Sequence, residues 1–162
     1  MTTMTMDDVG TALRDQPLVR EFTPAQVERL SRLADWIEFE PGEIIHREGD
    51  ECPLLYLVVR GHVAIELPGL HETLRVETVV PGGEFGWTAM LSGAGRYFQA
   101  RALDPVRALT FDAAGLRRMC DEDTAFGYAL MRRLLVVVAG RLQSTRLQVV
   151  DMLSTPAKRA GA

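Results

Sequence analysis

Several classes of protein are excluded by what this sequence lacks. It has only two cysteines, Cys52 and Cys120, which are far apart and form neither a disulfide framework nor a CxxC metal or redox motif. No apolar run approaches the roughly 18 residues that a membrane span requires. The polar, acidic start of the chain is unlike a signal peptide. We therefore expect a reduced, cytoplasmic setting, with Cys52 an ordinary loop cysteine.

Catalytic and metal-binding patterns are also missing. The sequence has no serine–histidine–aspartate set, no paired carboxylates and no Walker-type GK[ST], so we expect no enzymatic activity. His46, His62 and His71 are not spaced as metal ligands and have no acidic or cysteine companions, so no metal or haem cofactor is expected. A net charge of −4 argues against a surface devoted to nucleic acid.

What the sequence does contain is a series of short segments in which hydrophobic residues recur with a period of two. Glycine and proline separate them at regular intervals. Many short strands with this spacing indicate a mainly β body, either closed or formed of two sheets. The predicted strands are 35–39, one that starts at 44–45 and stops at Gly49–Asp50, 54–59, 62–67, 73–80, 99–103 and 106–111.

Helical patterns flank the strands. Apolar residues at helical spacing predict a helix over 7–15, and Thr23 with Gln26 forms a capping box that predicts a second helix. After the strands, Asp112 is a predicted cap for a short helix that ends near Cys120.

A long helix is predicted from Thr124 to Leu153, within a single domain over 6–153. We expect disordered ends over 1–5 and 154–162, because these segments are polar and the last one contains proline and glycine.

The long helix carries a narrow apolar seam at alternating steps of three and four residues, which favours a parallel homodimer. The seam, and so the predicted dimer interface, consists of Leu135, Val138, Leu142, Thr145, Val149 and Met152. The alternative is a helix that packs on its own β body, for which it also has apolar residues at Leu130, Leu134 and Leu147. Both arrangements can hold at once, and we favour the dimer.

The most informative stretch is 81–98, which holds five of the fourteen glycines and ends with Arg96, Tyr97 and Phe98. It predicts a turn, the start of a short helix, a second turn and a strand. Glycines let backbone N–H groups approach an anion, and a helix start offers unpaired N–H groups. Arg96 adds a planar, permanently charged fork that suits phosphate.

Taken in order, the motifs of this chain resemble the cyclic-nucleotide-binding domain of the catabolite-activator/FNR family. The matching segments are F-x-P-G-E-x-I at 39–45, REGD at 47–50, LYLVVRGHV at 55–63, PGGEFG at 81–86, Arg96 and RAL at 101–103. The resemblance covers about residues 16–153. It implies a double-stranded β-helix, a jelly-roll-like β-roll of eight strands, with small N-terminal helices and a long C-terminal helix that dimerises and caps the pocket.

The resemblance also implies roles for the residues of the cassette. In members that bind cyclic AMP, the arginine grips the cyclic phosphate, assisted by backbone N–H groups of the short helix. A glutamate accepts the ribose 2′-hydroxyl, and a serine or threonine donates to the phosphate. The positions that correspond to such a site, and so the candidate ligand-binding residues, are Phe85, Gly86, Trp87, Thr88, Ala89, Arg96, Tyr97, Phe98 and Thr145.

Three positions depart from the family pattern. Trp87 stands where the glutamate is expected, Tyr97 where the small hydroxyl residue is expected, and Phe98 where alanine is expected. Trp87 cannot accept a hydrogen bond, and leaving a ribose hydroxyl unpaired costs about 1–3 kcal/mol. Phe98 adds a ring where the family leaves room for the ligand. We therefore expect binding of cyclic AMP and cyclic GMP to be weak or lost.

Alternative roles remain open for several of these residues. Arg96 either faces an anion or pairs with Glu84 or another acid. Trp87 and Phe98 either form a platform for another ligand or fill a closed pocket, and we favour filling. Thr145 lies in R-L-Q-x-T, which in the catabolite activator reaches the adenine across the dimer. We favour a packing or register role for it here.

Two functional hypotheses follow. The first is a stand-alone sensor that binds a small anionic ligand and passes a change through the long helix. The second is a protein-interaction module with an occluded pocket and a protein partner that the sequence does not identify. We expect no direct DNA binding, because the chain ends nine residues after Leu153 and has no helix-turn-helix. Arg117–Arg118 and Arg132–Arg133 are interpreted as solvated helix faces.

Overall fold

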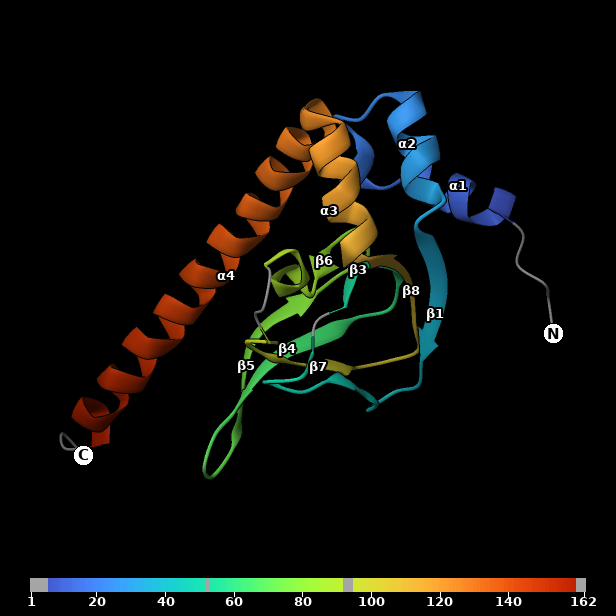
Figure 1. Ribbon diagram of the computed structural model, residues 1–162. Helices are drawn as coiled ribbons and strands as arrows, with labels where there is room; N and C mark the ends of the chain where they lie inside the picture. The colour runs from blue at the N-terminus through green and yellow to red at the C-terminus, as the bar shows by residue number, and fades with distance from the viewer. Residues whose placement is uncertain (1–5, 52, 92–94, 160–162) are drawn as a thin grey trace.

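The computed structural model describes residues 6–51, 53–91 and 95–159 (Figure 1). Two four-stranded antiparallel sheets form the β-roll, and helices cover one end of it. The predicted fold class is confirmed. Three earlier expectations lie outside the described residues: the disordered start at 1–5, the last residues of the tail, and the loop role of Cys52.

The first sheet carries the helices on its outer face. In order across the sheet, its strands are β1 (Ala34–Phe39), β8 (Val106–Asp112), β3 (Leu54–Arg60) and β6 (Glu84–Phe85). β3 is apolar along nearly its whole length because both of its faces are buried. Leu55 and Leu57 contact the helices, whereas Tyr56 and Val58 point into the roll.

The second sheet closes the other side of the roll. Its strands are, in order, β2 (Ile44–His46), β7 (Gln99–Ala102), β4 (Val63–Pro68) and β5 (Thr73–Val79). β5 is an edge strand of this sheet. Short β6, with two residues, was not predicted, because a pair of residues shows no periodicity.

The N-terminal helices are α1 (Met6–Arg14), the single turn η1 (Pro17–Val19) and α2 (Pro24–Ser31). The predicted capping box is present: the Gln26 amide donates to Thr23 Oγ1 over 3.2 Å and the Thr23 amide donates to Gln26 Oε1 over 2.9 Å. Asp112 caps α3 (Ala113–Glu122) by accepting from the Gly115 amide.

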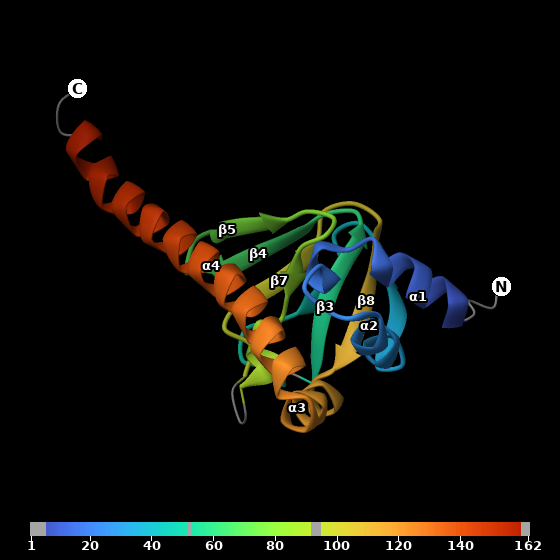
Figure 2. The ribbon, with the colours of Figure 1, turned by 90° about the horizontal axis from the view of Figure 1, so that it is seen from above.

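The last helix, α4 (Thr124–Arg159), leaves the helical end of the roll and passes along its side before projecting beyond it (Figures 1 and 2). The predicted end at Leu153 was too early, and the backbone of 154–159, which we expected to be disordered, is helical. Adding residues to an existing helix costs far less than nucleating one. A polar composition alone therefore did not mark the end of the helix.

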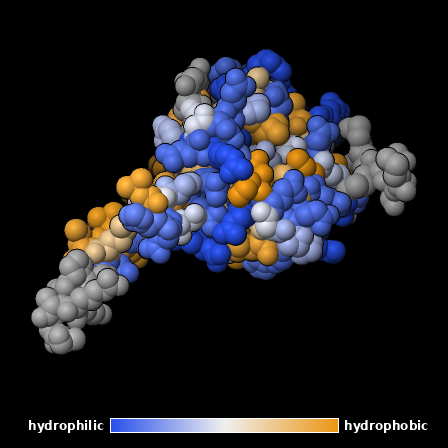
Figure 3. All heavy atoms as spheres, turned by 90° about the horizontal axis from the view of Figure 1, so that it is seen from below, coloured by the Kyte–Doolittle hydropathy of each residue, from blue (hydrophilic) through white to orange (hydrophobic). Residues whose placement is uncertain are grey.

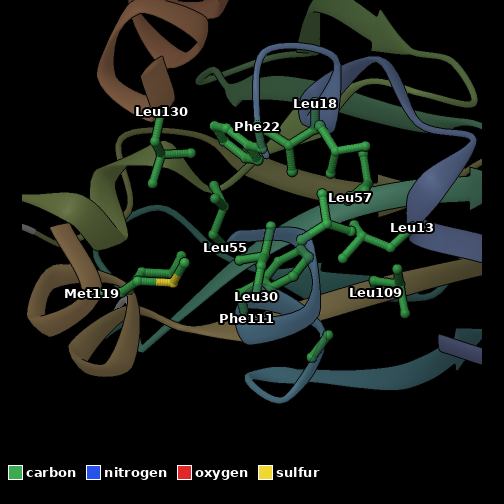
Figure 4. Packing of buried hydrophobic residues seen from close by; sticks show 14 of the residues in the cluster. Leu13, Leu18, Phe22, Leu30, Leu55, Leu57, Leu109, Phe111, Met119 and Leu130 are labelled. Carbon is green, nitrogen blue, oxygen red and sulfur yellow. The ribbon is translucent and has the colours of Figure 1, made fainter. Parts of the chain in front are cut away.

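Two hydrophobic clusters hold the domain together. One lies between the helices and the first sheet, where Leu13, Leu30 and Met119 meet Leu57 and Phe111 (Figure 4). The other fills the roll between the two sheets. Burial of each large apolar side chain contributes about 1.5–3 kcal/mol, so these clusters fix the frame on which the cassette of residues 84–98 sits.

Candidate ligand-binding site

The cassette begins where β6 ends. Gly86 has a left-handed backbone with φ of 81° and caps the short helix η2 (Trp87–Met90). A Cβ at this position would lie 2.6 Å from Arg96 Nη1 and 3.1 Å from the Leu54 oxygen. Both the backbone angle and this close approach require glycine. The turn and short helix predicted for this stretch are therefore present.

Arg96 lies against this turn with only 3% of its surface exposed. Its Nη1 donates to the Gly86 oxygen over 2.8 Å and its Nη2 donates to the Leu54 oxygen over 2.7 Å. Glu84, which we considered as its partner, accepts instead from Arg133. The guanidinium is thus held between the start of β3 and the Gly86 turn, at one wall of the cassette.

Aromatic rings form the floor beneath Arg96. Tyr56 and Phe85 are stacked, with ring centroids 4.6 Å apart and planes 3° apart. The Arg96 guanidinium carbon lies 5.7 Å from the centre of the Tyr56 ring. Burial raises the pKa of Tyr56, so this residue stays neutral and adds no charge to the site.

The three residues that depart from the family pattern lie around the mouth of the cassette. Trp87 and Tyr97 meet edge to face, with centroids 5.4 Å apart. Tyr97 is 49% exposed, whereas Phe98 is half-buried and packs on the core of the roll. Thr88 and Ala89 are buried beneath them. Among the predicted residues, the structure brings together Gly86, Trp87, Thr88, Arg96, Tyr97 and Phe98 around one cavity.

That cavity has a volume of about 20 Å³. Its remaining lining residues are His46, Ile65 and Arg141. A space of about 10–15 Å³ is enough for one water molecule, whereas sites for small organic ligands measure about 300–1,000 Å³. The volume of the cavity in this structure is therefore close to that of a water site and far below that of a typical small-ligand site.

His46, at the end of β2, contributes an unexpected polar group to the cavity. Its ring lies 6.3 Å from Tyr56 and 6.1 Å from Phe85, centroid to centroid. Burial lowers the pKa of His46 to about 4, and the charge of Arg96 acts in the same direction. The imidazole is therefore neutral at neutral pH. No sequence pattern marked this position beyond the histidine itself.

Two ion pairs, neither of them predicted, connect helix α4 to the roll. Arg133 Nε donates to Glu84 Oε1 over 2.7 Å, and Glu84 is 2% exposed. Arg141 Nε donates to Glu77 Oε2 on β5 over 2.8 Å. The interpretation of Arg133 as part of a solvated face was wrong. The eight-residue spacing of 133 and 141, which places both on one side of a helix, was the available signal.

Arg117 is a second correction. We interpreted it as solvated, but its Nη1 donates to the Ala89 oxygen over 2.7 Å. This bond joins α3 to the short helix η2 of the cassette. A displacement of η2 would therefore affect α3 through this bond and α4 through Arg141, which lines the same cavity as Trp87 and Thr88.

Thr145 lies further along α4 and does not line the cavity. Its Oγ1 donates to the oxygen of Arg141 over 2.9 Å, within its own helix. A hydroxyl used in this way caps a carbonyl of the helix that carries it. The adenine and register interpretations of Thr145 remain predictions.

The predicted seam of α4 is largely exposed. Leu135 is 66% exposed, Leu142 70%, Val149 51% and Met152 60%, whereas Val138 and Thr145 are half-exposed. Figure 3 shows hydrophobic residues gathered on the projecting part of this helix. Leu130 and Leu134 pack internally as the alternative expected, but Leu147 is 59% exposed.

The part of the chain that the structure describes contains neither a metal site nor a membrane-spanning helix. No group of three or more His, Cys, Asp and Glu side chains there is placed to hold a metal ion. None of the helices there combines the length and the apolar character needed to cross a membrane.

The β-roll and its cassette are similar to those of known proteins. The family model of the cyclic nucleotide-binding domain matches residues 36–123, which is more than half of the chain. The match runs from β1 through the cassette to the end of α3.

Individual relatives are distant. A protein of Rhodopseudomonas palustris named as a potassium channel is 26% identical over 84% of this chain and 32% of its own length. The CRP-like cAMP-activated global transcriptional regulator of Mycobacterium tuberculosis is 25% identical over 82% of this chain and 58% of its own length. The chain thus spans between a third and three fifths of these relatives.

A solved structure agrees over nearly its whole length. The crystal structure named for a cyclic nucleotide-binding protein of Geobacter metallireducens has a TM-score of 0.72 and 27% identity, covering 82% of this chain and 97% of that one.

Proposed function

This chain belongs to the cyclic nucleotide-binding domain family, and we propose that it acts there as a non-enzymatic sensor whose ligand is no longer a cyclic nucleotide. The cassette keeps its backbone, with Gly86 and Arg96, but its side chains favour a small anion. Binding of cyclic AMP and cyclic GMP is weak or lost.

The observation that carries this proposal is the filled cavity. Trp87 and Phe98 stand where the family has a glutamate and an alanine, and the space they leave is about 20 Å³. A ribose there would meet an indole in place of a carboxylate acceptor. Entry of a nucleotide would require both rings and α4 to move, and this movement is a cost that a ligand must repay from its binding energy.

The output of the sensor is the position of α4. Arg141 belongs to both the cavity wall and the ion pair with Glu77, so a ligand that changes one contact changes the other. We propose that α4 pairs with a second copy through Leu135, Val138, Leu142, Thr145, Val149 and Met152. A shift in α4 then alters the geometry of a homodimer.

Thermal unfolding with added cyclic AMP and cyclic GMP tests the loss of nucleotide binding. A ligand at 100 times its dissociation constant stabilises the fold by about 2.7 kcal/mol. We expect no shift of the melting temperature at millimolar nucleotide. A clear shift at micromolar cyclic AMP or cyclic GMP would mean that the pocket opens and that the family ligand is retained.

The alternative is an interaction module whose pocket binds nothing. The water-sized cavity favours it, and the exposed seam of α4 provides a surface for a protein partner. The two candidates differ in their response to small anions: the sensor is stabilised by an anion that reaches the cavity, whereas the interaction module is not.

A further inference from the structure

We propose that the cavity under α4 binds a compact oxyanion, with Arg141 as the group that selects it and Glu77 as the group that limits its affinity. This inference rests on the proposed function, since it names the ligand class of the same site. The shared chemistry is that of inorganic phosphate and of small carboxylates: few heavy atoms, negative charge and several acceptor oxygens.

Arg141 has a buried donor that no acceptor of the described residues satisfies. The residue is 4% exposed although it is charged, and its Nε is used by Glu77. Its Nη2 is buried and has no hydrogen-bond partner among the residues that the structure describes. A buried donor without an acceptor costs about 1–3 kcal/mol, and more when it is charged. An acceptor oxygen that enters the cavity removes this cost.

The opposite wall offers a second polar group. Both ring nitrogens of His46 are buried, and neither makes a hydrogen bond of good geometry within the described part of the chain, although the Phe98 backbone lies close enough to raise the pKa of the imidazole against the effect of burial. The neutral imidazole presents one N–H donor and one acceptor. It can therefore donate to an oxyanion, or accept from one that carries a proton. Arg96 lines the same cavity and adds positive charge.

The size of the cavity sets the size of the ligand. The cavity between Ile65, Phe98 and the arginines has a volume of about 20 Å³, so an ion of four or five heavy atoms requires the walls to move, but by less than a nucleotide would require. The guanidinium of Arg141 lies 5.8 Å from the centre of the Phe98 ring, so the ring occupies space beside the charge that a larger ligand would need. The site thus favours an isolated oxyanion over a nucleotide.

Glu77 tunes the affinity. Its carboxylate contacts Arg141 Nε, next to the Nη2 that an oxyanion would use. Two negative groups on one guanidinium repel each other, so the Glu77 carboxylate lowers the affinity of the site for an anion. A substitution that removes this charge but keeps the shape should strengthen binding.

The test is calorimetric titration of the full chain at constant ionic strength, with inorganic phosphate and acetate as separate probes. We expect saturable binding of at least one probe, and the two arms show whether a phosphate or a carboxylate is preferred. Arg141→Gln should weaken it by about tenfold or more, the worth of one charge-assisted hydrogen bond. Glu77→Gln should tighten it by a similar factor.

Arg132→Gln is the matched control, because Arg132 is exposed on the same helix, with 59% of its side chain accessible, and does not line the cavity. It should leave the affinity unchanged. Because an unfolded variant cannot bind more tightly, a gain of affinity in Glu77→Gln cannot be explained by unfolding. Equal binding by Arg141→Gln and the wild type, or no binding of either probe, would overturn the inference.

A cyclic AMP arm in the same titrations separates this inference from the proposed function. Micromolar binding of cyclic AMP by the wild type would show that the proposed loss of nucleotide binding is wrong. Weak cyclic AMP binding with no response to phosphate or acetate would leave that loss standing, reject the oxyanion site and favour the interaction module.

Discussion

The first turns of α4 and its middle pack on the rest of the domain by different means. At the start, Phe126, Leu130 and Leu134 are each no more than 5% exposed, and the Phe126 ring lies 4.8 Å from that of Phe22. In the middle, Arg141 pairs with Glu77 and lines the cavity that also contains His46. Arg133, which lies between these two parts, pairs with the buried Glu84. One contact is apolar and tightly packed, and the other is charged.

This difference indicates how the domain can respond to a ligand. Close-packed apolar contacts tolerate little rearrangement, so the start of α4 is fixed to α3 and the N-terminal helices. Charge contacts can exchange one partner for another of the same sign. The middle of α4 is therefore the part that an anion can reposition, about a fixed end.

Removing the fixed end should have the largest effect on stability. Phe126→Ala removes a fully buried ring, and we expect the free energy of unfolding to fall by about 3–5 kcal/mol. Urea denaturation measures it. Tyr128→Ala, two residues away and 67% exposed, should change the free energy by no more than about 0.5 kcal/mol. Similar losses in both variants would mean that the burial of Phe126 does not fix the start of α4.

Lowering the pH should reduce the free energy of unfolding because the buried His46 becomes harder to keep neutral. The pKa of His46 is about 4 in the folded protein, against an ordinary value of 6.5 that we take for the unfolded chain. Between these two pH values the unfolded chain therefore binds one proton more than the folded protein does. Stability from this group is complete above pH 6.5 and falls as the pH drops towards 4, by about 3 kcal/mol in total.

His46→Leu should flatten this part of the stability profile, measured by urea denaturation from pH 7 to pH 4.5. The exposed His71 provides the control, since His71→Gln should retain the full acid loss. An unchanged slope in His46→Leu would mean that other groups cause the loss.

Breaking the first ion pair should have a smaller effect. Arg133→Gln leaves the Glu84 carboxylate buried without its cation, and we expect a loss of about 2 kcal/mol, less than for a fully enclosed pair because Arg133 is partly exposed. Arg132→Gln should cost almost nothing. If the two variants unfold at the same urea concentration, the charged contact does not hold α4.

The seam should affect assembly with almost no effect on the fold of each subunit. Leu142 is 70% exposed, so Leu142→Arg should shift stability by no more than about 0.5 kcal/mol in the monomer. Sedimentation should show a dimer for the wild type, as proposed, and a monomer for Leu142→Arg. A dimer that survives this substitution would place the interface elsewhere.

Much of this fold could be predicted from local patterns. The period-two segments, the Thr23–Gln26 capping box and the Asp112 cap act over a few residues, so the sequence displays them directly. Contacts between distant residues were not visible: Arg133 and Glu84 are 49 positions apart, and Arg141 and Glu77 are 64 apart. His46 was considered only as a metal ligand, because its burial depends on how β2 meets the cassette.

The most direct test of the account is calorimetric titration of cyclic AMP into the wild type and into a Trp87→Glu/Tyr97→Ser/Phe98→Ala variant. The variant restores the family's acceptor, hydroxyl and free space. We expect no saturable binding by the wild type at millimolar cyclic AMP. In the variant we expect a gain in affinity of at least about tenfold, equivalent to about 1.4 kcal/mol. Micromolar binding by the wild type, with no gain in the variant, would contradict it.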